Sequence, residues 1–294
     1  MRQAVRVRAP AKINLLLRVL GLREDGFHEL ETLFQAIDFT DELTVELAGD
    51  SVDLEVAGTD AGPVTHNLAF RAAEAFRLAA DLHSGVRILL TKNIPTGAGL
   101  GGGSSDAAAV LRALNHLTGG AVAAEALLAI GADLGSDVPF FLCGSALALA
   151  RGRGDDLTSA PSLPTTEVVL VCPPVHVATG PAYAALAERR AITGSQAHAP
   201  LERVPSDWDT VDEIAGNDFE SLVADGHPEV RLALDFLRGA GLRLVMLSGS
   251  GGACFGLATG VSEASSTAQR LSDELGWTVL ATRTLDELPP VSPL

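Results

Sequence analysis

Apolar and polar side chains alternate along much of the first sixty residues, which is typical of half-buried β-strands. The longest such run, 11–20, places Lys12 and Asn14 on one face and Ile13 and Leu15 on the other. A lysine and an amide on one strand face are usually solvated, and the spacing alone favours that interpretation. Shorter strands are expected over 5–8, 31–37, 41–48 and 51–57.

A helical period replaces this alternation further along the chain. Residues 67–79 predict an amphipathic helix with Thr65 or Asn67 as its N-cap. Later segments alternate strand with helix, which predicts an α+β fold, and the proline-containing stretch 157–164 suggests a division into domains 1–156 and 157–294. A surface loop is expected over 192–209, helices over 122–134, 230–238 and 261–275 and from 179 and 217, and strands over 86–91, 145–151, 167–172, 243–247, 253–257 and 277–282.

A glycine-rich stretch lies between the strand 86–91 and an alanine-rich helical run that starts at Ala107. The expected order is therefore strand, glycine loop, helix N-terminus, with Ser104 or Ser105 as the N-cap. Unpaired N–H groups and the positive end of the helix dipole attract a phosphate at such a terminus. The loop is predicted to hold the phosphates of a nucleotide, and it consists of Pro95, Gly97, Ala98, Gly99, Leu100, Gly101, Gly102, Gly103, Ser104 and Ser105.

Other glycine motifs fit this loop less well. Gly97-x-Gly99-x-x-Gly102 matches the dinucleotide-binding fingerprint, but a second helix follows the loop helix where that fold requires a strand. No lysine follows the glycines as a Walker A loop requires, and the protein-kinase motifs His-Arg-Asp and Asp-Phe-Gly do not occur. A purely structural glycine turn stays open as an alternative.

The composition excludes several classes of partner. A net charge of −16 argues against binding to nucleic acid or to an anionic membrane surface. The longest uncharged apolar run, 138–150, is too short to span a bilayer. Three widely spaced cysteines fit neither a disulfide framework nor a C-x-x-C metal site, so a soluble protein of the reducing cytoplasm is expected.

The segment Pro95-x-x-Ala98-Gly99-Leu100-Gly101-Gly102-Gly103-Ser104-Ser105 resembles the phosphate loop of the GHMP kinases, a superfamily of small-metabolite kinases. Segments 10–15, 25–30, 135–141 and 247–255 also resemble motifs of this superfamily. Their order along the chain is that of the branch that phosphorylates 4-diphosphocytidyl-2-C-methyl-D-erythritol. The matching segments span nearly the whole chain. The resemblance implies a two-domain fold with an N-terminal ribosomal-protein-S5-like domain and a C-terminal ferredoxin-like domain.

The resemblance also implies two catalytic residues. Asp137 lies where the family has its catalytic base, and Lys12 lies where a lysine orients that aspartate and stabilises the transferring phosphoryl group. A buried pair with Asp137 explains Lys12 better than a solvated strand face does. From the sequence alone, Asp137 or Ser136 could instead be a helix N-cap.

By the same matching, Asn14, Phe27, His28, Asp137, Thr179 and Tyr183 fall at acceptor-binding positions. Phe27, where the family commonly has tyrosine, and Tyr183 would sandwich the cytosine ring, and His28 would bind its edge. Asn67 and Lys92 match positions near the adenine. Asp106 is expected either to point outward or to face a metal ion, and the late loop 248–252 either to close over phosphates or to form a tight hairpin.

The implied activity is phosphorylation, by ATP, of the 2-hydroxyl of that cytidine-diphosphate polyol in non-mevalonate isoprenoid synthesis. Mg²⁺ is expected with its ligands unassigned, and the chain is expected to be a monomer or homodimer. Another kinase of the superfamily, acting on homoserine, mevalonate or a sugar, is the nearest alternative. A nucleotide-binding module without catalysis is the alternative of a different class.

Overall fold

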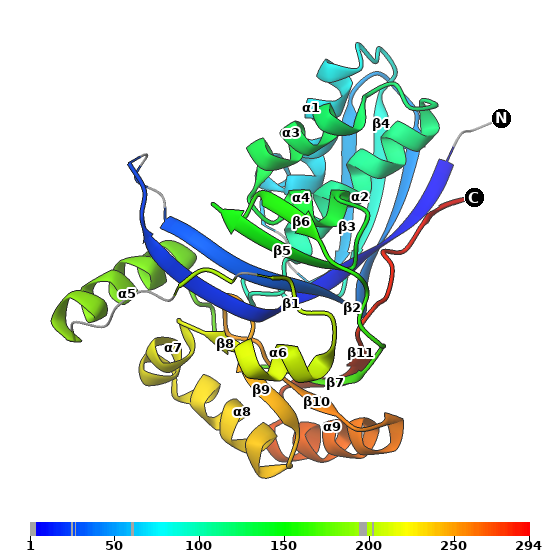
Figure 1. The fold of residues 1–294 in the computed structure, drawn as a ribbon. Helices are drawn as coiled ribbons and strands as arrows, with labels where there is room; N and C mark the ends of the chain where they lie inside the picture. The colour runs from blue at the N-terminus through cyan, green and yellow to red at the C-terminus, as the bar shows by residue number, and fades with distance from the viewer. Residues whose placement is uncertain (1–3, 25, 27, 60–61, 194–198, 202) are drawn as a thin grey trace.

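Two β-sheets and the helices that cover them make up the structure, a computed structural model that describes residues 4–24, 26, 28–59, 62–193, 199–201 and 203–294 (Figure 1). The first sheet follows the order β12-β1-β2-β4-β3, with β5 attached to β2, β6 attached to β5, and β8 attached to β1. Its strands are β1 Ala4–Leu22, β2 His28–Leu47, β3 Val52–Gly58, β4 Val86–Lys92, β5 Leu147–Gly152, β6 Asp156–Ser159, β8 Gly216–Asn217 and β12 Val291–Pro293.

β1 and β2 are much longer than the sequence pattern predicts. Each was expected as two strands, but each is continuous. The irregularity between Pro10 and Ala11, opposite Thr40 and Ile37, absorbs both breaks while the antiparallel pairing goes on. Both strands cross the middle of the molecule, between an upper and a lower group of helices (Figure 1). β1 thereby contributes side chains to the hydrophobic core of both halves of the protein.

Four helices accompany the first sheet: α1 Leu68–Ala79, α2 Gly102–Leu117, α3 Ala124–Leu134 and α4 Val138–Leu142, after a 3₁₀ turn, η1 Val64–His66. α2 packs on β1 and β2, and its buried alanines allow this close approach. The predicted cap of α1 is confirmed, since Asn67 Oδ1 accepts a hydrogen bond of 2.9 Å from the N–H of Ala69.

The second sheet is antiparallel, with the order β11-β7-β10-β9. α8 and α9 contact its strands. The expectation of a loop over 192–209 is wrong at its two ends, because one helix runs to 193 and another starts at 208 with Asp207 as its cap. The remaining elements are β7 Glu167–Cys172, β9 Arg243–Leu247, β10 Cys254–Ala258, β11 Thr278–Arg283, α5 Thr179–Thr193, α6 Trp208–Ile214, α7 Glu220–Gly226, α8 Pro228–Gly239 and α9 Val261–Leu275.

The two sheets share a hydrophobic core. Val169 and Val171 of β7 pack with the side chains of α8 and α9, whereas Leu170 packs in one cluster with Ile13 and Leu15 of β1. In addition, β8 and β12 come from the C-terminal half and pair with β1. The domain division at 156/157 stays a prediction. None of the helices in the described parts of the chain is long and apolar enough to cross a membrane.

Candidate active site

A cavity of about 280 Å³ opens where β1, the glycine loop, the turn before α4 and the late glycine loop meet. Several of the predicted site residues line it together, although they are far apart in sequence. They are Lys12, Asn14, Gly99, Gly101, Ser104, Asp137, Thr179 and Tyr183, joined by Leu17, Leu30, Thr32, Phe34, Gly135, Ser136, Arg153, Gly154, Gly249 and Ser250.

Lys12 and Asp137 form an ion pair at this cavity, with 3.6 Å between Lys12 Nζ and Asp137 Oδ2. Lys12 is 3% exposed, so the interpretation of a solvated strand face is wrong. Burial lowers the pKa of Lys12, and the Asp137 carboxylate opposes that shift. The side chain of Asp137 keeps 30% of its surface exposed, which leaves its carboxylate accessible from the cavity.

Hydrogen bonds to two further groups also hold the lysine. Lys12 Nζ donates to Asn14 Oδ1 at 2.7 Å and to the carbonyl of Gly99 at 2.8 Å. Asn14 in turn donates to Thr32 Oγ1 at 2.7 Å, and Thr32 donates to the carbonyl of Leu16. Sequence reasoning missed Thr32, which lies on β2 opposite Leu17 of β1. The lysine is therefore held in one position rather than free to swing.

Asp137 is the residue before α4, yet its side chain makes no capping hydrogen bond. The interpretation of Asp137 as a structural N-cap is therefore wrong. Its backbone has φ −85° and ψ −12°, and Pro139 follows within the first turn. The proline favours the start of the helix, and the Asp137 carboxylate does not cap it.

The glycine loop turns by means of backbone conformations that glycine adopts without strain. Gly97, Gly99 and Gly101 have φ values of +71°, +82° and +70°. α2 begins at Gly102 with Gly101 as its N-cap, so the prediction of Ser104 or Ser105 as the cap is wrong by several residues. Ser104 lies at the cavity within the first turn, whereas Ser105 is 1% exposed and faces the interior.

The late glycine loop packs directly against the first one. A Cβ on Gly99 would overlap the carbonyl oxygen of Ser248, and a Cβ on Gly251 would overlap the backbone N of Gly99. Ser248 Oγ donates to the carbonyl of Gly99 at 3.0 Å, and the N–H of Ala253 donates to that of Ala98, also at 3.0 Å. The interpretation of a hairpin serving only its own two strands is therefore too narrow, since the late loop also buttresses the first loop.

A second cavity of about 480 Å³ adjoins the first. His28 and Tyr183 line it, with ring centroids 5.0 Å apart, and Phe219 packs edge-on to Tyr183 at 4.7 Å. Burial raises the pKa of Tyr183, so the phenol stays neutral. Phe27 lies outside the described residues. The shared lining is Leu30, Ser136, Arg153, Thr179 and Tyr183, which makes the two cavities one continuous site.

Arg153 brings a positive charge to the junction of the two cavities. Sequence reasoning treated the run Arg151-Gly152-Arg153-Gly154 only as the end of a strand. The signal available in the sequence was the pair of glycines Gly152 and Gly154. In the structure both have positive φ and turn the chain at the end of β5 toward the site.

The residues predicted near the nucleotide occupy different depths. Ala98 and Leu100 bury their side chains, so only their backbone is available to a ligand. Asn67 caps α1, and like Pro95 and Gly97 it does not line either cavity in the described structure. Lys92 is 4% exposed, which is a poor position for direct contact with an adenine ring.

Lys92 instead bonds to the carboxylates of Asp41 and Asp106. The expectation that Asp106 points outward or faces a metal ion is wrong, because its side chain is 2% exposed and lies 2.8 Å from Lys92 Nζ. No local sequence pattern indicates this cluster, because Asp41 lies 51 positions before Lys92 and Asp106 lies 14 positions after it.

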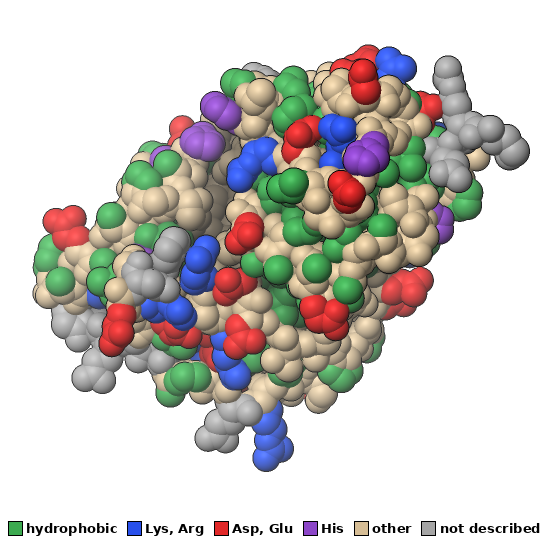
Figure 2. Space-filling model, turned by 90° about the horizontal axis from the view of Figure 1, so that it is seen from above, with side chains coloured by type: hydrophobic (Ala, Val, Ile, Leu, Met, Phe, Trp, Pro, Cys, Tyr) green, Lys and Arg blue, Asp and Glu red, His purple; other side chains and the backbone are tan. Residues whose placement is uncertain are grey.

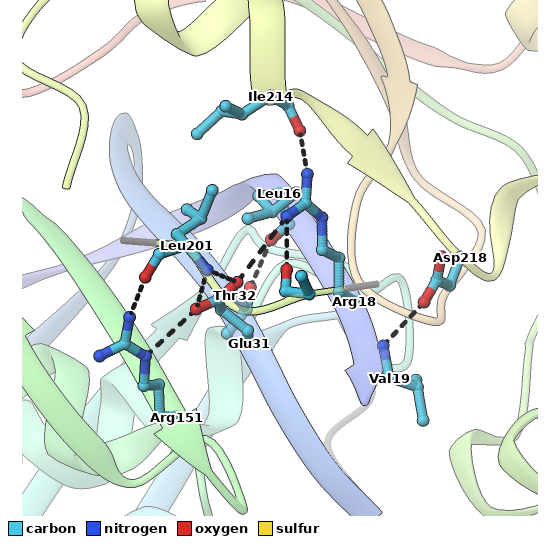
Figure 3. Close-up of polar contacts among 10 residues, drawn as sticks. Leu16, Arg18, Val19, Glu31, Thr32, Arg151, Leu201, Ile214 and Asp218 are labelled. Carbon is cyan, nitrogen blue, oxygen red and sulfur yellow. Dashed lines mark hydrogen bonds and ion pairs between the residues drawn. The ribbon is translucent and has the colours of Figure 1, made fainter. Parts of the chain in front are cut away.

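Another buried carboxylate, Glu31, holds the segment that follows α5 against the first sheet (Figure 3). Glu31 is fully buried and accepts hydrogen bonds from the N–H of Leu201 at 2.9 Å and from Arg151 Nε at 3.1 Å. Arg151 also donates to the carbonyl of Leu201. Arg18 of β1 adds a contact to the carbonyl of Ile214. Glu31 precedes Thr32, so this anchor is next to the bonds that hold Lys12.

One face of the molecule has no single dominant charge. Figure 2 shows acidic and basic side chains interspersed on that face rather than gathered into a basic patch. Within the described ranges, no group of three or more histidine, cysteine, aspartate or glutamate residues is placed to hold a metal ion. Lys12 and Arg153 at the cavity and the N–H groups at the start of α2 suit a small anionic ligand.

Comparison with known proteins gives consistent matches over both halves. Residues 67–145 match the family model "GHMP kinases N terminal domain", and residues 197–276 match "GHMP kinases C terminal". A curated 4-diphosphocytidyl-2-C-methyl-D-erythritol kinase from Geobacter sp. (strain M21) is 40% identical over 94% of this chain and 98% of its own. A protein of the same name from Solibacter usitatus is 44% identical over 85% of this chain and 80% of its own.

Solved structures agree. The crystal structure of a 4-(cytidine 5'-diphospho)-2C-methyl-D-erythritol kinase has a TM-score of 0.78 and 39% identity, covering 95% of this chain and 98% of its own. A homoserine kinase from Cytophaga hutchinsonii has a TM-score of 0.66 at 21% identity, covering 100% and 98%, which supports the fold alone. The expected two-domain α+β fold is confirmed.

Proposed function

The chain belongs to the GHMP kinase family, and we propose that it is a 4-diphosphocytidyl-2-C-methyl-D-erythritol kinase, which transfers the γ-phosphoryl group of ATP to the 2-hydroxyl of its acceptor. The observation that carries this proposal is the Lys12–Asp137 pair, which faces a cavity continuous with the His28–Tyr183 cavity. Phosphoryl-transfer groups and a ring-binding site are thereby joined in one site.

Asp137 is proposed to accept the proton of the acceptor hydroxyl as its oxygen attacks the γ-phosphorus. The bond from the γ-phosphorus to the β–γ bridging oxygen breaks, and ADP leaves with that oxygen. Lys12, 3.6 Å from Asp137, stabilises the charge on the transferring group. Because the ion pair makes Asp137 a weaker base, positioning and electrostatics supply most of the rate.

The nucleotide's phosphates fit the glycine loop. The N–H groups at the start of α2 lack intrahelical partners, and Ser104 adds a hydroxyl at the cavity. Mg²⁺ bound with ATP would neutralise phosphate charge. Its coordination would come mostly from phosphate oxygens and water, because the described residues provide no carboxylate cage.

The acceptor's cytosine ring fits the second cavity beside His28 and Tyr183. Thr179 and Arg153 lie between that cavity and Asp137, where the diphosphate and the polyol of the acceptor would pass. Homoserine or mevalonate would leave the ring cavity empty. We further propose a cytoplasmic location, because Cys143, Cys172 and Cys254 are all unpaired.

The first test replaces the proposed base. Asp137→Asn is expected to lower kcat by about 10²–10⁴-fold, the range for loss of a general base, while the affinity for ATP changes less than about threefold. Asp133→Asn, an exposed carboxylate on α3, is the matched control and should keep full activity. Coupled ADP release and calorimetric ATP binding give the two readouts. Activity of Asp137→Asn near that of the control would contradict Asp137 as the base.

The second test varies the acceptor. The wild-type protein should phosphorylate the cytidine-diphosphate polyol at least about a hundredfold more efficiently, in kcat/KM, than homoserine or mevalonate. Comparable turnover of an acceptor without the nucleotide would favour another kinase of the superfamily. ATP binding without turnover of any acceptor would favour a non-catalytic nucleotide-binding module.

A further inference from the structure

Three charged side chains are packed together beneath the glycine loop. Lys92 at the end of β4 bonds to Asp41 on β2 and to Asp106 in α2, and none of the three lines either cavity of the site. Their exposed fractions are 4%, 0% and 2%. Two carboxylates facing one ammonium leave this sealed cluster with one net negative charge when all three groups are ionised, which is costly away from water.

The two carboxylates are not equally well satisfied. Asp41 Oδ1 accepts backbone hydrogen bonds from Asn93 at 2.6 Å and Ile94 at 2.8 Å, and Asp41 Oδ2 bonds to Lys92. Asp106 Oδ2 also bonds to Lys92, but Asp106 Oδ1 is buried with no hydrogen-bond partner among the described residues. A proton in this cluster therefore belongs on Asp106, where it removes an unsolvated charge.

The cluster lies directly behind the proposed phosphate site. Lys92 Nζ is 2.8 Å from the position that a Cβ on Gly102 would take, and Asp106 lies one turn further along α2. A Cβ on Gly101 would instead be 3.0 Å from Lys12 Cγ. Successive glycines of the loop thus lie against two different buried lysines, one at the cavity and one in the sealed cluster.

We propose that binding of ATP at the glycine loop is coupled to uptake of one proton from solvent by the Asp106 carboxylate, whose neutral form favours the nucleotide-bound state. The inference rests on the proposed function for the placement of the nucleotide. A phosphate anion in front of α2 disfavours a negative charge on Asp106, one turn further along the helix, so nucleotide and proton assist each other's binding. Burial raises the pKa of Asp106 to about 7, with Lys92 opposing the shift and Asp41 adding to it, so the carboxyl titrates near neutrality before ATP arrives.

The other charged groups around α2 are accounted for separately. Lys12 and Asp137 pair with each other at the cavity, and Glu31 belongs to the cluster with Arg151. α4 and β12 carry no charged residue. On α2 itself Arg112 bonds to the carbonyl of Pro289, and the charged groups Arg71, Glu74 and Asp133 of α1 and α3 line a separate groove.

The test measures protons directly. Adenylyl imidodiphosphate with Mg²⁺ is titrated calorimetrically into the full-length protein at pH 7.5, in buffers of different ionisation enthalpy, and its affinity is measured from pH 6.5 to 8.5. The wild-type protein is expected to take up at least about half a proton more than Asp106→Asn. Its affinity should fall about three- to tenfold from pH 7 to pH 8, because one coupled proton gives at most tenfold per unit.

Asp106→Asn keeps the shape of the side chain but cannot titrate, so its affinity should change less than about twofold over the same interval beyond any change shared with a control. That control is Asp133→Asn, the same chemical change on the exposed surface of α3, which should behave like the wild type. Asp41→Asn is the second variant. Removing the neighbouring charge lowers the pKa of Asp106, so proton uptake should fall below that of the wild type.

Equal proton uptake and equal pH dependence in the wild type and Asp106→Asn would overturn the inference alone, provided that the wild type turns over the acceptor. If Asp106→Asn does not fold, equal uptake in the wild type and Asp41→Asn has the same meaning. If the wild-type protein does not bind the analogue at all, the proposed function fails, and the inference fails with it.

Discussion

Asp106 has a consequence for stability at the scale of a single carboxyl group. Its pKa is raised by burial to about 7 in the folded protein, from an ordinary value of 3.8. Between these values the folded chain holds a proton that the unfolded chain has released. The unfolding free energy from this group therefore falls as the pH rises through that window, and it levels off above about pH 7.

Urea unfolding of the wild type and Asp106→Asn at pH 5, 6, 7 and 8 checks this prediction. The wild type should lose stability relative to the variant by roughly 1 kcal/mol per pH unit between pH 5 and 7, and the difference should then stay constant. The exposed carboxyls with lowered pKa, such as Asp207 and Asp225, titrate in both proteins alike. Parallel pH curves for the two proteins would contradict the assignment.

At this scale the sequence was informative where a motif existed. Lys12, Asn14 and Asp137 were predicted through a family resemblance, and the structure brings them to one cavity. The pairing of Lys92 with Asp41 and Asp106 was not predicted, because an ion pair between residues from different elements leaves no local pattern. The roles of single residues could be predicted from the sequence, whereas their partners distant in the chain could not.

The contact between the two glycine loops leads to a prediction at the scale of elements. Gly99→Ala should lower the unfolding free energy by at least about 2 kcal/mol, because a methyl group would overlap the Ser248 carbonyl and φ is +82°. Gly103→Ala is the matched control: its Cβ would meet nothing closer than 3.7 Å, and in a helix it should gain up to about 1 kcal/mol. Denaturant unfolding measures both, and equal effects would contradict the close packing of the two glycine loops at Gly99.

Most elements could be predicted from periodicity, including α1 with its Asn67 cap and the strands of the second sheet. The start of α2 could not. Serine is the better N-cap by preference, but close packing of Gly101 against Lys12 and a φ of +70° require glycine at that position. Tertiary contacts thus moved the helix start upstream of the residues that local preference favours.

Glu31 gives a prediction at the scale of the whole molecule, because it joins the first sheet to the segment after α5. Glu31→Ala leaves the Leu201 N–H without its buried acceptor and should cost about 1–3 kcal/mol of unfolding free energy. Glu29→Ala, on the same strand but in an exposed pair with Arg23, should cost less than about 1 kcal/mol. Hydrogen exchange should also accelerate at the Leu201 amide in Glu31→Ala, and unchanged protection there would contradict the anchoring role.

The overall arrangement was predictable only through resemblance. Alternating strands and helices predict an α+β fold, but they cannot show that Leu170 packs with Ile13 or that β12 pairs with β1. These contacts join residues more than a hundred positions apart, where loop closure depends on the whole chain. The division at 156/157 stays a prediction from composition: it falls inside β6, and it says nothing of the core shared across it.

The pairing of β12 with β1 bears on how the chain acquires its shape during synthesis. The ribosome makes β1 roughly 270 residues before β12, so the outer edge of β1 at Val5–Val7 stays without its final neighbour while the rest emerges. Throughout that interval the unpaired backbone N–H and C=O groups of this strand edge are available to other nascent chains. The three-residue strand β12 therefore covers the edge of β1 only at the end of synthesis. Pairing with a neighbouring chain before that point is favoured most where many copies are translated close together.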